Sequence, residues 1–261
     1  MRRFKWVFWL VLPAMVMLAD GRFSRSEERK GIVAFAEGEV RKQPPASEMW
    51  ENAPVQSAVN SGEKVRTYQM SRAELELIQL DIIRLAPKTT VLLDRLYEET
   101  REKKLATSIK VEKGEIWASV HEVNAETEFD ISAPVAAAAI TGTVLRMTVR
   151  DDSTTQLKVY KGEVKITNAT DKPDPAPKPS GKPVQIEGPK PIQGPHEVSL
   201  DEWVYIVKGM QQITIDPKGI VLSMGQFSRK DMDEQTDWVK WNKQREDIRR
   251  RRLQNMMQKR R

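Results

Sequence analysis

Gly114-Glu115-Ile116-Trp117 decides the fold of this chain, because a related segment recurs at three other places. A Gly-Glu pair heads a β-rich stretch at Gly38-Glu39-Val40, Gly62-Glu63-Lys64-Val65 and Gly162-Glu163-Val164. The four glycines are 24, 52 and 48 residues apart, or roughly one, two and two units of about 24 to 26 residues, a period typical of stacked repeats. The spacing predicts a β-solenoid. The alternative is four ordinary turns in a β-rich domain.

The glycines are expected at corners where the backbone needs a positive φ angle, which glycine adopts at little cost. Each corner would end one extended run and begin the next. The glycines predicted to form structural turns are Gly38, Gly62, Gly114, Gly142 and Gly162.

Short strands with alternating polarity lie between these corners. Residues 72–78 place alanine and leucines on one side and charges on the other, which is typical of a half-buried strand. The same pattern recurs at 109–111, 115–120, 144–149 and 156–160. Residues 133–140 are instead continuously small and apolar, which predicts a fully buried strand closed by Thr141-Gly142-Thr143.

The ordered set of these blocks resembles the FecR domain. The blocks are Gly62 to Thr67, Ser71 to Leu77, Ile83 to Pro87, Gly114 to Trp117, Pro134 to Thr143 and Val159 to Val164, within a span from Gly31 to Ile166. The resemblance implies a periplasmic or envelope-exposed, β-solenoid-like module. Such modules are best known from proteins that relay the state of an outer-membrane receptor to a cytoplasmic sigma factor.

Two features depart from the FecR pattern. The turn that follows the Ala-Glu-Leu-Glu-Leu strand usually contains glycine, but here it reads Leu80-Asp81-Ile82-Ile83. Sigma-regulating members carry a long cytoplasmic segment before a membrane span, whereas only Met1 to Lys5 precede the first apolar stretch. We therefore expect the domain to serve something other than direct binding of a sigma factor.

The amino end indicates export. Arg2, Arg3 and Lys5 precede an apolar stretch over 6–19, which has the length of a signal peptide and is shorter than the about 20 residues that span a bilayer. Residues 1–22 are predicted to be a signal peptide, with an uncleaved N-terminal anchor as the alternative. The sequence contains no cysteine, which excludes disulfides, thiol chemistry and a lipobox anchor.

The predicted organisation continues beyond a FecR-like β domain at 31–168. Residues 171–195 hold eight of the fifteen prolines and predict an exposed, stiff linker. Residues 197–229 predict a β capping segment, with a turn at Asp216-Pro217-Lys218-Gly219. Residues 231–261 lack glycine and proline and predict a basic C-terminal helix, in which Trp238, Trp241 and Ile248 share one face.

The C-terminal helix carries the predicted interaction residues. Trp238 and Trp241 are expected to dock on the β body, and Arg249, Arg250, Arg251 and Arg252 belong to a basic tail. Anionic lipid headgroups are the favoured partner of such a tail in the envelope, since no nucleic-acid fold motif accompanies it. A solvated terminus is the alternative reading.

No motif predicts catalysis, a cofactor or a metal site. His121 and His196 have no second histidine or cysteine at ligand or triad spacing, and Asp151 to Thr154 is expected to be a plain turn.

The fold class predicted is mainly β, a FecR-like solenoid with a C-terminal α-helix. The predicted function is a non-catalytic binding or scaffold module in the periplasm or cell envelope, which contacts an envelope protein, the cell wall or the membrane surface. The alternatives are a membrane-anchored relay acting in signal transduction with a separate sigma-factor regulator and, less favoured, a β-helical polysaccharide-active enzyme. Nothing in the sequence specifies an oligomeric state.

Overall fold

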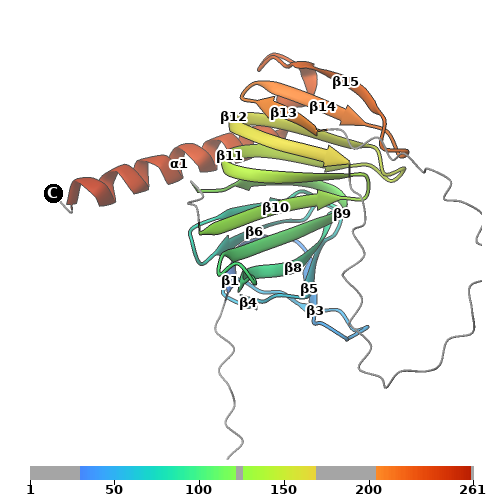
Figure 1. The fold of residues 1–261 in the computed structure, drawn as a ribbon. Helices are drawn as coiled ribbons and strands as arrows, with labels where there is room; N and C mark the ends of the chain where they lie inside the picture. Colours follow the sequence, from blue (N-terminus) through green and yellow to red (C-terminus); the bar gives the residue numbers. More distant parts are fainter. Residues whose placement is uncertain (1–29, 122–125, 169–203, 260–261) are drawn as a thin grey trace, which may run out of the picture.

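The computed structural model describes residues 30–121, 126–168 and 204–259 (Figure 1). The predicted signal peptide and proline-rich linker lie outside these residues. The described part is mainly β with one α-helix at its C-terminal end, which confirms the predicted fold class at that level. The strands are β1 (Gly31–Glu37), β2 (Val40–Gln43), β3 (Glu51–Asn52), β4 (Ala58–Val59), β5 (Glu63–Thr67), β6 (Arg72–Leu77), β7 (Ile82–Leu85), β8 (Thr90–Glu99), β9 (Leu105–Ser119), β10 (Thr127–Ala133), β11 (Ala136–Val149), β12 (Thr155–Asn168), β13 (Val204–Lys208), β14 (Gln211–Ile215) and β15 (Val221–Gln226); a 3-10 helix η1 (Met232–Glu234) precedes α1 (Asp237–Lys259).

The strand pairings divide into two layers that share three long strands. The first half of β9 pairs with β8 and β10, and its second half pairs with β7 and β11. The strands β11 and β12 divide in the same way, because β12 pairs with β14 before its midpoint and with β13 after it. One layer therefore runs from β1 through β6, β7, β9, β11 and β12 to β14 and β15.

Glycines lie where the three long strands pass between layers. Gly114 in β9, Gly142 in β11 and Gly162 in β12 have φ angles of 93°, 63° and 83°. Gly38 and Gly62, in the connections before β2 and β5, also have positive φ. A Cβ atom on Gly114 would lie 2.6 Å from Cα of Thr89, so both conformation and space demand glycine there.

The solenoid is not confirmed. Successive coils of a solenoid pair in parallel, whereas the described ladders are antiparallel except for that between β9 and β10. The run 133–140 was wrongly predicted as one fully buried strand. It contains a turn at Pro134 and Val135 between β10 and β11, and Ala139 is exposed. The corner at 80–83 is made without glycine, with Leu80 at φ 63°.

One hydrophobic core lies between the layers. In the layer that runs from β1 to β15, alternate residues point inward, including Leu75, Ile83, Leu145 and Val159, all with no exposed surface. Burying such side chains contributes about 1.5–3 kcal/mol each to folding. The opposite, outer face of this layer is covered by η1 and α1, and this face carries the candidate site.

Candidate interaction site on the outer sheet face

A single row of side chains crosses the outer face of the layer at matching register. The paired residues, from β1 to β14, are Phe35, Glu74, Arg84, Trp117, Arg146, Lys158 and Gln212. Because paired residues in adjacent strands point to the same side of a sheet, the row forms a continuous polar and aromatic strip. Arg84, Trp117, Arg146 and Lys158 are each at most 4% exposed. The three cations Arg84, Arg146 and Lys158 are therefore buried and need partners.

Arg84 at the middle of the row joins the sheet to the helix. Its Nε donates to Glu74 Oε2 at 2.6 Å, and its Nη1 donates to Glu246 Oε1 of α1 at 2.6 Å. Arg245 of α1 donates to both carboxylate oxygens of Glu74, at 2.7 and 2.8 Å. Burial opposes ionisation of Glu74, but the bond from Arg245 and the charge of Arg84 outweigh it, so the pKa of Glu74 lies below its ordinary value.

An aromatic cluster covers the same part of the row. The Trp241 ring lies 5.5 Å from Phe35 and 5.4 Å from Trp238, centroid to centroid. The guanidinium carbons of Arg72 and Arg245 lie 5.1 and 4.9 Å from the Trp241 ring. Such cation–π contacts contribute about 0.5–2 kcal/mol, more when they are shielded from water. Trp241 thus docks on cations as much as on apolar surface.

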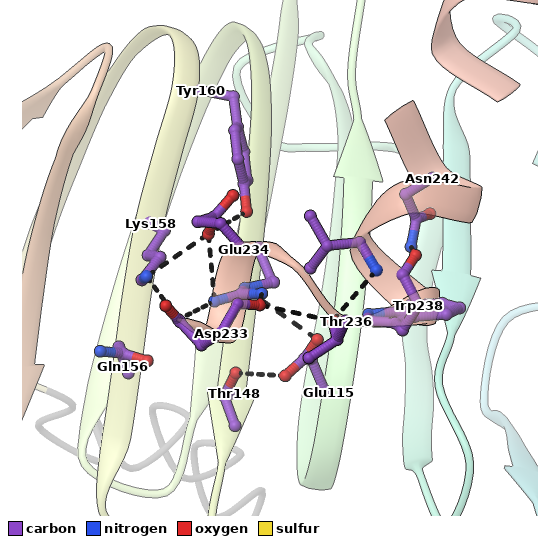
Figure 2. A network of polar contacts seen from close by, with 12 residues as sticks. Glu115, Thr148, Gln156, Lys158, Tyr160, Asp233, Glu234, Thr236, Trp238 and Asn242 are labelled. Atoms are coloured by element: carbon purple, nitrogen blue, oxygen red, sulfur yellow. Dashed lines mark hydrogen bonds and ion pairs between the residues drawn. The ribbon is translucent and has the colours of Figure 1, made fainter. Parts of the chain in front are cut away.

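A second charge cluster lies where η1 crosses β11 and β12 (Figure 2). The carboxylate Oδ2 of Asp233 lies 2.5 Å from Arg146 Nη2 and 2.5 Å from Lys158 Nζ. Glu234 is fully buried; its Oε1 accepts from Tyr160 at 2.9 Å and lies 3.4 Å from Lys158 Nζ. Burial opposes ionisation of Asp233, but Lys158 and Arg146 hold its pKa below the ordinary value. Both acids therefore neutralise the sheet cations.

Glu115 behaves differently although it lies on the same face. Its Oε2 accepts from Thr148 at 2.9 Å, and its Oε1 is 4.0 Å from Arg146 Nε. Burial raises the pKa of Glu115, and the charge of Arg146 offsets this effect only in part. The surroundings of Glu115 therefore disfavour its charged form, in contrast to those of Glu74 and Asp233.

Three aromatic rings lie beside the second charge cluster, in which Tyr160 donates to Glu234. Trp117 stacks on Tyr160 at 4.4 Å between centroids, and Phe227 meets Tyr160 edge-on at 5.3 Å. The apolar surroundings and the neighbouring Glu234 raise the pKa of Tyr160, so its hydroxyl keeps its proton and remains a donor.

Among the side chains of α1 that the structure describes, Arg249 forms the contacts with the body that lie nearest the C-terminal end. It donates to Ser119 Oγ at 2.6 Å, to the carbonyl of Leu80, and its Nη2 lies 2.9 Å from Nδ1 of His121. The backbone N–H of His121 donates to Asp81, which also accepts from Tyr97 at 2.8 Å. A small depression lined by Asp81, Tyr97, His121 and Phe129 adjoins this contact.

The structure separates the predicted interaction residues into two groups. Trp238, Trp241 and Arg249 contact the β body, whereas Arg250, Arg251 and Arg252 are exposed. Arg250 pairs with Asp247 of its own helix. Ile248, which was expected on the docked face, is 51% exposed. The helix continues past the edge of the body in this region (Figure 1).

The pattern of the sequence did not reveal the residues that hold the helix. Glu74, Arg84, Arg146 and Lys158 occupy the polar positions of alternating strands, which ordinarily face water. The available signal was the presence of long cationic side chains at the centres of successive strands, across from a C-terminal segment that contains Asp233 and Glu234.

Comparison with known proteins finds a family model that matches part of the chain. The model described as FecR protein matches residues 63–165, and the resemblance read from the sequence blocks is thereby confirmed for this part. Two similar solved structures are those of "a putative anti-sigma factor from Parabacteroides distasonis ATCC 8503", at 1.65 and 2.50 Å resolution, with 13% identity and TM-scores of 0.42 and 0.41. Each similarity covers 62% of this chain and 59% of the other, so it spans about three fifths of that protein. No curated protein matches.

Proposed function

We propose that this FecR-family chain is a non-catalytic binding or scaffold module of the cell envelope, which takes part in signalling by holding another envelope component. The observation that carries this proposal is the seating of η1 and α1 on the outer sheet face. That face binds a polypeptide segment through charges paired in register, notably Arg84 with Glu246 and Lys158 with Asp233. This intramolecular contact supports a role in holding another polypeptide.

The charged groups of this face support a binding role over a hydrolytic one. A glycosidase needs two carboxyl groups that flank an open groove and reach a sugar. Asp233 and Glu234 instead form ion pairs with Arg146 and Lys158, and Glu234 has no exposed surface. These two carboxylates are therefore engaged in holding η1 on the sheet.

The proposed location is the periplasm or envelope, and the basic, apolar amino end supports export. Within the described ranges, no helix has the length and hydropathy needed to cross a membrane. The second candidate, a membrane-anchored relay that works with a separate sigma-factor regulator, is favoured by the apolar stretch at 6–19 if it is retained. Mass spectrometry of the native protein separates the two, because cleavage near residue 19 supports the exported module and an intact Met1 in the membrane fraction supports the relay.

The proposed function is tested by site-specific photo-crosslinking in the bacterial envelope. A photoreactive residue is placed at the exposed Ile206 or Leu222 of the capping strands, or at Arg251 beyond the body. We expect a discrete cross-linked envelope protein at one or more of these positions. The absence of any cross-link to an envelope protein or to cell-wall material, together with turnover of a polysaccharide by purified protein, would overturn the proposal.

The exposed cations beyond the body support a contact with anionic lipid as a secondary element of this function. Arg250, Arg251 and Arg252 are exposed on the part of α1 that follows its last body contact at Arg249. Basic residues near an anionic surface are attracted by about 1 kcal/mol each. Arg245 and Arg249 do not contribute to this element, since Glu74 and Ser119 already hold them.

A further inference from the structure

Charged and polar groups form much of the contact between the helix and the sheet, beside the aromatic cluster around Trp241. In the described part of η1 and α1, the buried side chains are Glu234, Val239 and Asn242, of which only Val239 is apolar. Trp238 and Trp241 are only partly buried. Permanent intramolecular contacts are usually built from apolar side chains, and polar interfaces are typical of partners that exchange.

The charges nevertheless match in register along the whole contact. Asp233 and Glu234 face Arg146 and Lys158 at one end. About three helical turns away, Arg245 faces Glu74 and Glu246 faces Arg84. Buried ion pairs add little net stability compared with apolar residues of the same size. They do discriminate strongly between matched and mismatched partners.

We propose that the outer face of β6, β7, β9, β11 and β12 is a docking surface for a helical segment of another envelope protein, and that η1 and α1 occupy this surface in the isolated chain. The partner segment carries two adjacent carboxylates, a tryptophan about two turns later, and an Arg-Glu pair beyond it. The inference rests on the proposed function and names its binding surface. Charge complementarity selects this occupant, because removal of the helix leaves Arg84, Arg146 and Lys158 without their helix carboxylates and leaves Glu74 with Arg84 but without Arg245.

The tether gives the chain's own helix an advantage that a partner must overcome. A segment joined by a short connection has an effective concentration in the millimolar range. The five residues 227–231 connect β15 to η1, so displacement requires a partner with tighter contacts or with its own attachment nearby. Weakening the intramolecular contact should therefore make the face accessible in trans.

The experiment uses the full chain and a fluorescent synthetic peptide of residues 229–250 as the probe. The substitutions Asp233→Asn and Glu234→Gln remove both carboxylates that neutralise Arg146 and Lys158 while keeping side-chain shape. We expect this variant to bind the peptide at least about tenfold more tightly than the unaltered chain, since truncated charge pairs loosen the tethered helix. If circular dichroism shows that this variant does not fold, a second variant with Arg245→Gln and Glu246→Gln takes its place, because it loosens the other end of the contact between α1 and the sheet.

Charge reversal tests whether the recognition follows the proposed register. A peptide with Asp233→Lys and Glu234→Lys should lose binding to the loosened protein. It should regain binding when the protein also carries Arg146→Glu and Lys158→Glu. The matched control peptide carries Asp237→Lys and Asp247→Lys, two exposed positions with the same change in net charge, and it should bind like the unaltered peptide.

Two outcomes overturn the inference. One is equal binding of the charge-reversed and control peptides to the loosened protein. The other is a failure of the unaltered peptide to bind the loosened protein, although rapid deuterium exchange of the α1 amides shows that its own helix has left the face. Envelope cross-links from Ile206 or Leu222 without peptide binding would reject this surface and leave the proposed function in place. Peptide binding without any envelope cross-link would leave the face as a helix-docking surface but would reject the proposed function and, with it, an envelope protein as the partner.

Discussion

Glu74 and Glu115 lie on the same sheet face, yet the fold shifts the pKa values of their carboxyl groups in opposite directions. Glu74 accepts hydrogen bonds from Arg84 and Arg245, which favour its charged form despite burial. Glu115 has Thr148 as its hydrogen-bond donor and Arg146 at 4.0 Å, and burial dominates. The difference lies in the number of cations in contact, and it gives the two residues opposite effects on stability as pH changes.

Glu74→Gln should destabilise the protein at neutral pH and have little effect in acid. The folded-state pKa of Glu74 is lowered, so its contribution is present above its unfolded-state pKa and is lost as pH falls through the folded-state value. Removing one partner of a buried ion pair costs about 3–5 kcal/mol. Melting temperatures of both proteins between pH 3 and 8 measure this, with Glu76→Gln as a control on the same strand. A difference that does not change with pH would contradict the assigned charge state.

Glu115→Gln should show the reverse pH dependence. The folded-state pKa of Glu115 is raised, so its stabilising effect is complete below the unfolded-state pKa and is lost as pH rises through the folded-state pKa. The variant cannot acquire this charge, so its melting temperature relative to the unaltered protein should increase from pH 4 to pH 7. Urea titrations at the two pH values provide the free energies. A relative stability that falls over this interval would show that Arg146 stabilises the carboxylate.

Gly114→Ala should destabilise the body strongly, because glycine is required there by both φ and space. The angle is 93° and the added Cβ would meet the Thr89 backbone at 2.6 Å. The backbone strain alone costs about 1–3 kcal/mol. Gly225→Ala is the matched control, since nothing lies within 4 Å of its added Cβ. Thermal melts followed by circular dichroism should separate the two; equal melting temperatures would mean that the strand bend adapts to a side chain.

Truncation of α1 should reveal a sharp boundary at Arg249. Removing 250–261 takes away the exposed Arg250, Arg251 and Arg252 and should leave the melting temperature nearly unchanged. Removing 249–261 also deletes the bonds to Ser119 and Leu80 and should cost about 1–3 kcal/mol, as for hydrogen bonds made by a charged group. A gradual loss across both truncations would indicate that the exposed end also supports the fold.

Replacing Arg250, Arg251 and Arg252 with glutamine should weaken binding to vesicles that contain anionic lipid. The attraction is screened within a Debye length of about 8 Å at physiological salt, so binding of the unaltered protein should fall as salt rises. Co-sedimentation at low and high salt measures both effects. Lys240→Gln, at an exposed position on the docked part of the helix, is the control. Equal binding by the triple variant would place any lipid contact elsewhere on the molecule.

The sequence by itself determined the local structure, because that structure follows from short-range patterns. Alternating polarity predicted β6 and parts of β9, β11 and β12, and the glycines of the sequence were expected at backbone corners. The absence of glycine and proline after residue 231 predicted a C-terminal helix, which corresponds to α1. Strands, turns and helices depend on the backbone φ angle, the side-chain volume and the solvent exposure of residues close together in the chain, so the nearby sequence is sufficient to predict them.

Only the tertiary structure decided what the polar face does. Arg84 and Glu246 are 162 residues apart, and their contact exists only because the layer is assembled and η1 directs α1 across it. An alternating pattern records which side of a strand is polar, and it carries no information on whether water or another segment covers that side. The three glycine bends also join two antiparallel layers where the repeat predicted stacked coils, since strand pairing depends on how distant segments return to one another. The candidate site of this protein thus forms only when η1 and α1 pack on the distant sheet, where the buried charges find partners that the local sequence does not specify.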